Sequence, residues 1–502
     1  MFKHMSVGEK RSGPGLIRLA AMAVALPMVM AGGGHAQEPA AASAAMTAQA
    51  PVTLPPLSAA QAALVFKVLG DAPLHGLSAT AYAPADVAGE PTPEQHKALA
   101  DGLVRYAHDL RVGRLLPGDF PAMWGLRPAP FDPTPELAQA IATDRLGPFL
   151  DSLAPAYSGY SALRRGLARY RAIADDGGWK PVPEGAAFGL GATGPRVAAL
   201  RARLAAEDKD VPADGATFDT ALQQGVIRAQ RRFGLKPDGV VAGETLAALN
   251  QPVGQRVLQV IANMERWRWM PRTMPATRVQ VNSGAAIVTL FRNDKPVLSM
   301  KAVSGRAGGD ETPMLASEIH SVVLNPPWNV PTSIANEELW PKERKNPGYL
   351  TRSGYVVIPT EGGGKRLQQK AGPTSALGRY KFDFENPYSV YLHDTPSKGG
   401  FDRYARQASH GCVRLEKPQA LAEALLAADP AWSKEAIAGK VAAGTTVRAQ
   451  LPDRIPVYIL YWTTFAGADG QMHFRSDPYG WDRGLLQRVG VLAGSKSKGS
   501  EA

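Results

Sequence analysis

Two short stretches decide how this chain is understood: residues 388–393 (Tyr-Ser-Val-Tyr-Leu-His) and residues 409–414 (Ser-His-Gly-Cys-Val-Arg). Successive side chains of an extended strand point to opposite faces. Tyr391 and His393 therefore share one face, and Cys412 and Arg414 share one face in the second stretch, while the apolar residues between them point inward. If the two polar faces meet, a cysteine and a histidine come together beside an arginine.

Cys412 is the single cysteine of the chain. A thiol attacks as the thiolate, and a free cysteine has a pKa of about 8.5, so a nearby base or cation is needed at neutral pH. His393 and His410 are both candidates for that base. Gly411 lets the main chain approach closely, and the N–H groups of Gly411 and Cys412 are the expected oxyanion donors. The alternative interpretation of Cys412 is a buried, inert thiol.

Composition limits the classes of function. A length of 502 residues indicates several domains. The net charge of +11 is spread along the chain without an Arg/Lys run interleaved with aromatic residues, so we expect no nucleic-acid partner. One cysteine excludes an intrachain disulfide and a cysteine-rich zinc site, and no H-E-x-x-H motif occurs. We expect no metal and no cofactor.

The N-terminal region divides into three parts. Residues 1–36 have the pattern of an export signal: basic residues, an apolar run over 19–30, and a small-residue cleavage site. Residues 37–56 form an Ala/Pro-rich linker. Residues 57–185 have helical periodicity, with apolar side chains at 99, 103, 106 and 110, and are expected to form a helical scaffold domain.

A compact module of three short helices follows at residues 189–251. One apolar stripe runs through 197, 200 and 204, a second through 218, 222, 226, 229 and 233, and a third through 245, 246 and 249. Turn chemistry stands between them at residues 234–239 (Gly-Leu-Lys-Pro-Asp-Gly). The run resembles the small three-helix peptidoglycan-binding domain, which implies attachment to the cell wall.

Residues 275–452 are expected to form a mostly β domain. Residues 286–291 and 321–324 are β-branched runs, and 388–393 alternates. Between about 331 and 378 the strand pattern lapses into charge and glycine, which suggests a lid-like insertion near a site. A helix is predicted from Pro418, and residues 453–502 are assigned to a C-terminal extension and tail.

The motif of His393 followed by Ser409-His410-Gly411-Cys412 resembles the active-site signature of the L,D-transpeptidase family. Further agreement comes from residues 325–331 (Asn-Pro-Pro-Trp-Asn-Val-Pro), 378–382 (Gly-Arg-Tyr-Lys-Phe) and 263–269 (Asn-Met-Glu-Arg-Trp-Arg-Trp), the last typical of the larger periplasmic members. The resemblance implies the following fold: a helical N-terminal region and a three-helix peptidoglycan-binding module, followed by a mostly β catalytic domain with a lid-like insertion.

The resemblance also implies roles for individual residues. Cys412 is the expected nucleophile and His393 the expected general base, while Gly411 and His410 shape the catalytic site. The substrate-binding candidates are Arg414, Ser409, Tyr391, Asp394 and Trp328. The alternative for Arg414 is a structural salt bridge, for Trp328 plain core packing, and for Asp394 a side chain that points to solvent.

The implied reaction forms 3→3 cross-links between meso-diaminopimelate residues through a thioester on Cys412. The alternatives are an L,D-carboxypeptidase, a transferase that anchors a protein to the wall, and a non-catalytic peptidoglycan-binding protein. The expected partners are stem peptides and glycan of peptidoglycan, with other cell-wall synthases as candidates. We also expect carbapenem-type inhibitors to acylate Cys412, and a periplasmic location in a Gram-negative envelope.

Overall fold

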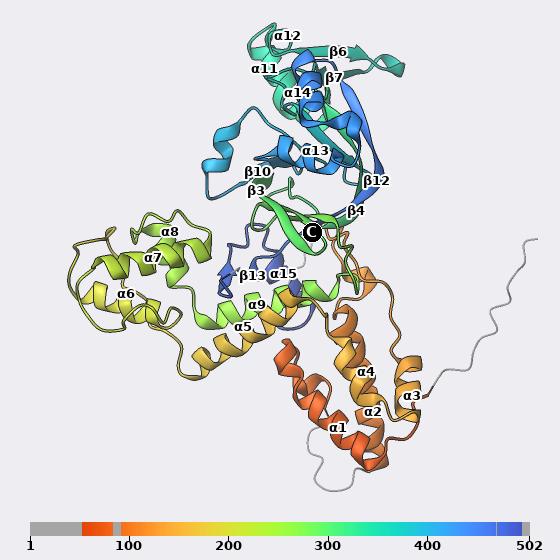
Figure 1. The fold of residues 1–502 in the computed structure, drawn as a ribbon. Coiled ribbons are helices and arrows are strands. Elements are labelled where there is room, and N and C mark those ends of the chain that lie inside the picture. Colours follow the sequence, from red (N-terminus) through yellow and green to blue (C-terminus); the bar gives the residue numbers. More distant parts are fainter. Residues whose placement is uncertain (1–52, 84–91, 468, 494–502) are drawn as a thin grey trace, which may run out of the picture. The chain divides into compact units, whose positions relative to one another are not determined.

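The computed structural model describes residues 53–83, 92–467 and 469–493 (Figure 1). The predicted export signal and most of the predicted linker lie outside the described residues. None of the helices in the described ranges combines the length and the apolar character that crossing a membrane requires.

The N-terminal region is helical, as predicted. Its longest helix begins after Thr92, whose side chain accepts a hydrogen bond from the Gln95 N–H, and the predicted apolar stripe of this helix is buried. Its elements are α1 (Ala59–Gly70), η1 (Ala72–His75), η2 (Ala79–Ala81), α2 (Pro93–Val112), η3 (Pro117–Asp119), α3 (Thr134–Ala142), α4 (Leu146–Leu153) and α5 (Ser158–Asp175).

The second module contains the three predicted helices: α6 (Pro195–Ala205), α7 (Thr220–Phe233) and α8 (Gly243–Leu249). Their apolar stripes meet in one core, in which Leu200, Leu222 and Leu249 are fully buried. Gly234 ends α7 with a φ of 70°, in the left-handed region that favours glycine.

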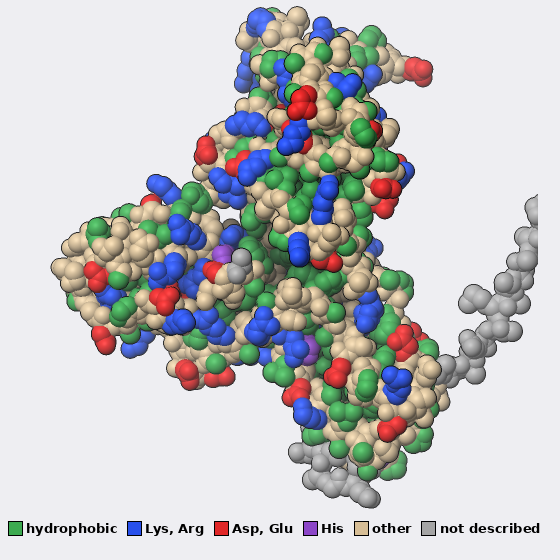
Figure 2. Space-filling view, viewed as in Figure 1, with side chains coloured by type: hydrophobic (Ala, Val, Ile, Leu, Met, Phe, Trp, Pro, Cys, Tyr) green, Lys and Arg blue, Asp and Glu red, His purple; other side chains and the backbone are tan. Residues whose placement is uncertain are grey.

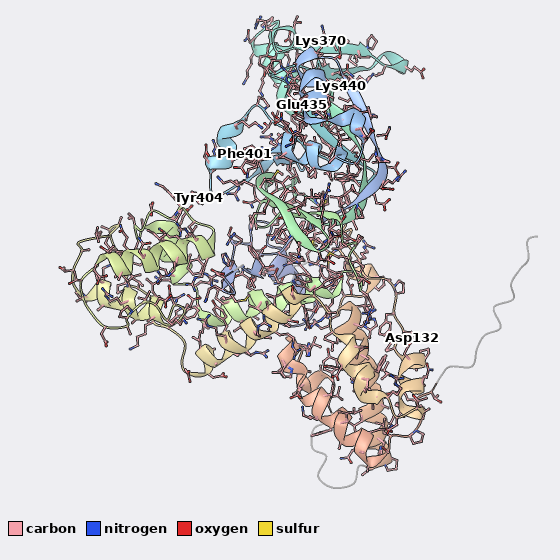
Figure 3. The ribbon with its side chains drawn as sticks, in the orientation of Figure 1. Asp132, Lys370, Phe401, Tyr404, Glu435 and Lys440 are labelled. Atoms are coloured by element: carbon pink, nitrogen blue, oxygen red, sulfur yellow. The ribbon has the colours of Figure 1, made fainter. Side chains whose placement is uncertain are left out.

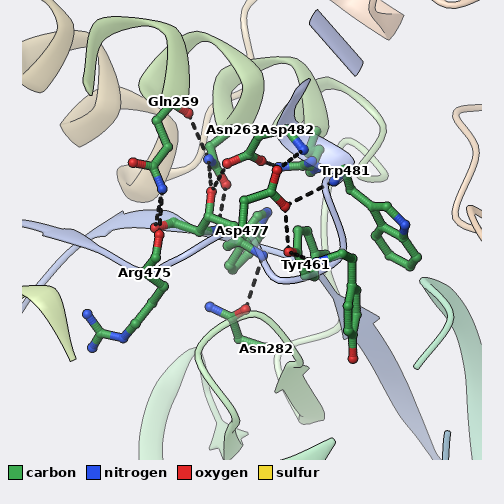
Figure 4. A network of polar contacts seen from close by, with 12 residues as sticks. Gln259, Asn263, Asn282, Tyr461, Arg475, Asp477, Trp481 and Asp482 are labelled. Atoms are coloured by element: carbon green, nitrogen blue, oxygen red, sulfur yellow. Dashed lines mark hydrogen bonds and ion pairs between the residues drawn. The ribbon is translucent and has the colours of Figure 1, made fainter. Parts of the chain in front are cut away.

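Helix α9 (Val253–Arg268) connects this module to the β domain and packs against the C-terminal segment. Figure 4 shows the contacts: Asn263 Nδ2 donates to Thr463 Oγ1 at 2.8 Å, and Gln259 Nε2 donates to the Arg475 carbonyl at 2.7 Å. Arg266 and Asp482 form a buried ion pair at 2.5 Å. The segment assigned from sequence to an extension and tail therefore contains ordered elements: β13 (Thr464–Ala466), β14 (Met472–Phe474) and α15 (Trp481–Arg488).

The β domain is built on a sheet of nine strands within the described residues, in the order β10-β3-β11-β9-β8-β4-β12-β1-β2. Strand β2 also pairs with β3, so the sheet closes on itself around an apolar core. The strands are β1 (Arg278–Asn282), β2 (Ile287–Arg292), β3 (Lys295–Gly305), β4 (Leu315–Leu324), β8 (Tyr380–Phe384), β9 (Leu392–His393), β10 (Gln407–Ser409), β11 (Val413–Leu415) and β12 (Val447–Leu460). The predicted helix from Pro418 is α13 (Pro418–Leu426), and α14 (Lys434–Ala443) follows; the short helices η6 (Lys398–Asp402) and η7 (Pro430–Trp432) lie in the loops.

Strand β12 extends to Leu460, beyond the predicted domain boundary at 452. Its pairing with β4 shifts register between Gln450 and Ile455. The irregularity interrupts the alternation of apolar and polar residues, so the sequence pattern ended before the strand did.

The predicted insertion also contains more strand than its sequence indicated. Strands β6 (Tyr355–Pro359) and β7 (Lys365–Gln369) pair with each other, and β7 pairs with β5 (Trp328–Asn329). Its helices are α10 (Thr332–Ile334), η4 (Ala335–Leu339), α11 (Trp340–Lys345) and α12 (Tyr349–Arg352), with η5 (Glu361–Gly363) in the hairpin. Leu367 is buried in the insertion's own small core with Leu339 and Leu350. It is the only buried apolar residue of β7, and β6 has no buried residue, so there is little alternation to detect.

Candidate active site

Two short strands bring the predicted site residues together. Strands β9 and β11 pair in parallel, with Leu392 opposite Val413 and His393 opposite Arg414. Leu392 and Val413 are fully buried in the core of the sheet. The sequence predicted that Leu392 and Val413 point into the core while their chain neighbours point to the opposite face. The burial of these two residues confirms this prediction, because side chains alternate along a strand, and Cys412 is one of those neighbours.

The thiol of Cys412 lies in a desolvated but polar setting. Burial raises the pKa of this thiol, while hydrogen bonds from the Tyr391 main chain and hydroxyl, and the charges of Lys381 and Arg414, lower it. The same contact raises the pKa of the Tyr391 hydroxyl, although burial is the larger cause. The Lys381 ammonium lies 4.3 Å from the centre of the Tyr391 ring. Two cations and one hydroxyl therefore favour the thiolate.

His393 is held as a neutral imidazole. Its Nδ1 atom lies 2.5 Å from the main-chain carbonyl oxygen of Asp394. Because a carbonyl oxygen can only accept, Nδ1 carries the proton and Nε2 keeps a free lone pair. Burial, with the Arg414 charge second, lowers the pKa of His393 to about 3. The ring is therefore uncharged at neutral pH and can accept a proton.

The structure does not place the imidazole in contact with the thiol. Among the hydrogen bonds of residues 53–83, 92–467 and 469–493, none joins His393 to Cys412. Tyr391 contacts both residues: its ring centre lies 5.5 Å from that of the His393 ring, and its hydroxyl hydrogen-bonds with the thiol. Hydrogen bonds of catalytic groups often tighten only once substrate is bound.

The carboxylate of Asp394 makes different contacts from its main-chain carbonyl. Its carboxylate accepts hydrogen bonds from the Arg379 N–H at 2.8 Å and the Thr395 N–H at 2.7 Å, and it pairs with Lys398 at 2.6 Å. It is buried, so the alternative of a side chain in solvent is wrong. Asp394 orients the base through its main chain while its carboxylate fixes the surrounding loop.

The loop that carries the nucleophile is held by two hydroxyl groups. Ser409 Oγ donates to the Cys412 carbonyl at 2.6 Å and accepts from the Gly411 N–H at 3.3 Å. Thr312 Oγ1 donates to the Gly411 carbonyl at 2.7 Å. Gly411 has a φ of 104°, which residues with a side chain rarely adopt. The Cys412 N–H has no hydrogen-bond acceptor among the described residues, which leaves it available as an oxyanion donor.

The insertion reaches this loop through His410. The His410 Nε2 atom lies 2.6 Å from Oε1 of Glu338, which belongs to η4. His410 is therefore bound to the insertion and not to the thiol. Trp328 lies on β5, which precedes the insertion and pairs with its strand β7, and it hydrogen-bonds with the Tyr391 hydroxyl. Two contacts thus connect the insertion to the site.

Arg414 has no carboxylate within 4.0 Å among the described residues, so the alternative of a structural salt bridge is not supported. The expected site residues lie on or beside β9, β10 and β11, except for Trp328, which lies on β5. Sequence reasoning missed Lys381, Glu338 and Thr312. The alternation of Tyr380, Lys381 and Phe382 was available as a signal for Lys381, whereas nothing in the sequence marks Glu338 or Thr312.

Comparisons with known proteins match three parts of the chain to described families. Residues 276–448 match the model of the "L,D-transpeptidase catalytic domain", residues 193–249 that of the "Putative peptidoglycan binding domain", and residues 56–167 that of the "Scaffold domain". A Haemophilus influenzae protein named "Putative L,D-transpeptidase" is 33% identical over 219 residues, which are 40% of this chain and 44% of that protein. This chain therefore spans less than half the length of that relative.

Solved structures of low identity were also found. One is the L,D-transpeptidase (residues 123–326) of Xylanimonas cellulosilytica, at 19% identity and a TM-score of 0.19, covering 56% of this chain and 100% of that one. Another is L,D-transpeptidase 3 of Mycobacterium tuberculosis in complex with a faropenem-derived adduct, at 13% identity and a TM-score of 0.19, covering 37% of this chain and 60% of that one.

Proposed function

We propose that this chain, which carries an L,D-transpeptidase catalytic domain and a peptidoglycan binding domain, forms 3→3 cross-links in peptidoglycan through a thioester on Cys412. One observation carries the proposal: a desolvated thiol and a neutral imidazole lie on one face of neighbouring strands, beside Lys381 and Arg414. The cations favour the thiolate. The imidazole is uncharged, and its Nε2 lone pair is free to accept the thiol proton.

In the first step, the Cys412 sulfur attacks the carbonyl carbon of the L,D-amide that follows diaminopimelate in a tetrapeptide stem. The thiol proton passes to His393 Nε2, and the Cys412 N–H stabilises the oxyanion. A single donor of this kind contributes about 3 kcal/mol to the transition state. The C–N bond then breaks, the amine of D-Ala takes the proton from the imidazolium, and the thioester remains.

In the second step, the amine of a second stem attacks the thioester carbonyl and gives its proton to His393. The C–S bond breaks, the amide cross-link forms, and the thiolate regains a proton. Water as the acceptor would give a free tripeptide, and an amine of a protein would anchor that protein. The insertion, joined to the site by Glu338 and Trp328, supports transfer because it shields the thioester from water.

Arg414 is assigned to a carboxylate of the substrate, because it lies beside the thiol without an ion-pair partner among the described residues. A planar guanidinium can bind a carboxylate in two parallel hydrogen bonds. The substrate implies that the chain works where peptidoglycan is, so export to the periplasm belongs to the proposal. Cell-wall synthases are the partners it would meet there.

The decisive experiment incubates the purified protein with disaccharide-tetrapeptide and identifies the products by mass spectrometry. We expect a 3→3 dimer and released D-Ala, and neither product from the Cys412→Ala variant. Free tripeptide without dimer would show that the activity is that of a carboxypeptidase and not of a transpeptidase. Absence of both products, in protein whose Cys412 still reacts with iodoacetamide, would leave only a binding role. A carbapenem should add its mass to Cys412 and abolish dimer formation.

A further inference from the structure

A second cavity, away from the thiol, lies where α7, α8 and α9 meet the loop at 404–407 and the C-terminal segment from Phe474 to Ala493. We call it the arginine groove. It encloses about 1170 Å³, a size typical of a site for a large ligand. The loop at 404–407 continues through β10 into the nucleophile loop, so the arginine groove and the active site share one chain segment. Figure 3 labels Tyr404, which is exposed on that loop.

Five arginines line the arginine groove, and no ion pair of the described residues includes any of them: Arg231, Arg256, Arg406, Arg475 and Arg483. Elsewhere in the described part of the chain, the buried Arg266 and Arg203 are paired with acids. Elsewhere, Lys and Arg side chains are spread over the face seen in Figure 2. The arginine groove is a local concentration of unpaired positive charge.

The acids of the arginine groove do not neutralise this charge. Asp482 is committed to Arg266 at 2.5 Å. Asp477 accepts hydrogen bonds from the Tyr461 hydroxyl at 2.6 Å and from the Trp481 N–H at 3.0 Å (Figure 4). Glu244 is the remaining carboxylate, and it is exposed at the rim. Three acids face five arginines, and one of the three is already paired.

The inner arginines are held in place by the protein, as in a prepared binding site. The Arg256 guanidinium lies between two rings, 4.9 Å from the centre of Phe233 and 4.6 Å from that of Phe474, and its buried Nε has no hydrogen-bond partner. Arg475 donates to the Arg232 carbonyl at 2.7 Å. Burial, and secondly the charge of Arg406, lower the pKa of Arg475 to about 10. The guanidiniums of Arg406 and Arg475 therefore repel each other, and an anion between them would relieve that repulsion.

We propose that the arginine groove binds the ionised carboxylates of a peptidoglycan stem peptide that is not itself reacting at Cys412. Guanidinium groups match carboxylates in geometry and charge, and the exposed ring of Tyr404 offers a surface on which a sugar ring can pack. This inference rests on the proposed function for the identity of the polymer. Binding here would hold a neighbouring stem close to the segment that leads to the nucleophile.

The single cysteine of the chain allows a test that reports on the arginine groove alone. Cys412→Ala removes the thiol and prevents thioester formation, and Ser476→Cys then introduces a unique labelling site on an exposed residue that lines the arginine groove. A trifluoromethyl tag on that thiol is followed by 19F NMR in the full chain. The probes are disaccharide-tetrapeptide, the same disaccharide without peptide, and inorganic pyrophosphate.

We expect the tag to respond to disaccharide-tetrapeptide, and the pair Arg231→Glu with Arg483→Glu to weaken that binding about fivefold, because reversed rim charges repel a carboxylate. Both arginines are exposed, and their side chains have no hydrogen bond or ion pair with described residues, so the fold should be kept. The matched control is Arg165→Glu with Lys209→Glu, which changes the net charge equally on exposed residues outside the arginine groove and should leave the affinity unchanged.

Equal weakening by the groove pair and the control pair would overturn the proposal, as would no response to the tetrapeptide. Equal binding of the peptide-free disaccharide would overturn the assignment to the stem peptide, and a response to pyrophosphate alone would assign the site to a phosphate ligand instead. Because the tagged protein lacks Cys412, these results are independent of transfer. Dimer formation by the wild-type protein tests the proposed function separately.

Discussion

Replacing Tyr391 with phenylalanine tests which group sets the reactivity of the nucleophile. The Tyr391 hydroxyl hydrogen-bonds with the thiol and lowers its pKa, while His393 makes no hydrogen bond to it in the described structure. Phenylalanine keeps the ring that packs against His393 and Lys381 and removes only the hydroxyl. The substitution therefore isolates one hydrogen bond to the developing thiolate.

The size of the effect follows from that hydrogen bond. A hydrogen bond to a charged group contributes about 1.5–3 kcal/mol, and one pKa unit corresponds to about 1.4 kcal/mol. Tyr391→Phe should thus raise the thiol pKa by about one to two units. The thiolate that remains is more nucleophilic, with a Brønsted coefficient of about 0.4–0.5. The net loss in alkylation rate at neutral pH is about three- to tenfold.

The assay is the rate of iodoacetamide alkylation as a function of pH, followed by mass spectrometry. Because the chain has one cysteine, every adduct reports on Cys412. Tyr355→Phe is the matched control, since Tyr355 packs near Trp328, with ring centres 6.4 Å apart, and makes no hydrogen bond to the thiol. A pH profile of Tyr391→Phe that coincides with the wild type would refute the reasoning, as would an equal shift in the control.

Other predictions address the remaining groups. Arg414→Gln should raise the pKa of the Cys412 thiol by about half a unit to one unit, because it removes an unpaired cation, and should raise the KM for tetrapeptide; an unchanged KM in steady-state kinetics would contradict a role in substrate binding. Glu338→Gln weakens the contact with His410 by about 0.2–1 kcal/mol, so the ratio of free tripeptide to dimer should rise about two- to fivefold. An unchanged ratio would show that the contact between the insertion and His410 does not help to exclude water. Burial lowers the pKa of His393 from 6.5 to about 3, so between these values the unfolded chain binds a proton that the folded chain does not, and the free energy of unfolding should fall as the pH falls. Urea unfolding at pH 7 and at pH 4 should show that the free energy of unfolding falls less for His393→Gln than for the wild type. Equal falls in the two proteins would refute this.

Much of the fold was open to prediction because its signals are local. The apolar stripes of α2, α6, α7 and α8 repeat at helical spacing, and each proved to be a buried face. The alternation around Leu392 and Val413 was enough to assign the faces of β9 and β11, because strand geometry fixes which neighbours share a face. The alternation is broken at the irregularity in β12 and in the short strands of the insertion. At these places the sequence pattern predicted less strand than the structure contains.

The sequence by itself determined three features of this chain: a single thiol next to a glycine, a histidine on the polar face of a strand, and a helical module of the peptidoglycan-binding type. The tertiary structure decided which groups meet: Tyr391 and not His393 lies on the thiol, Glu338 binds His410, and five arginines from separate segments line one groove. The reason is physical. Which side a residue faces depends on its immediate neighbours in the chain, whereas the partner of a side chain depends on the register of strands and the packing of segments that are far apart in sequence.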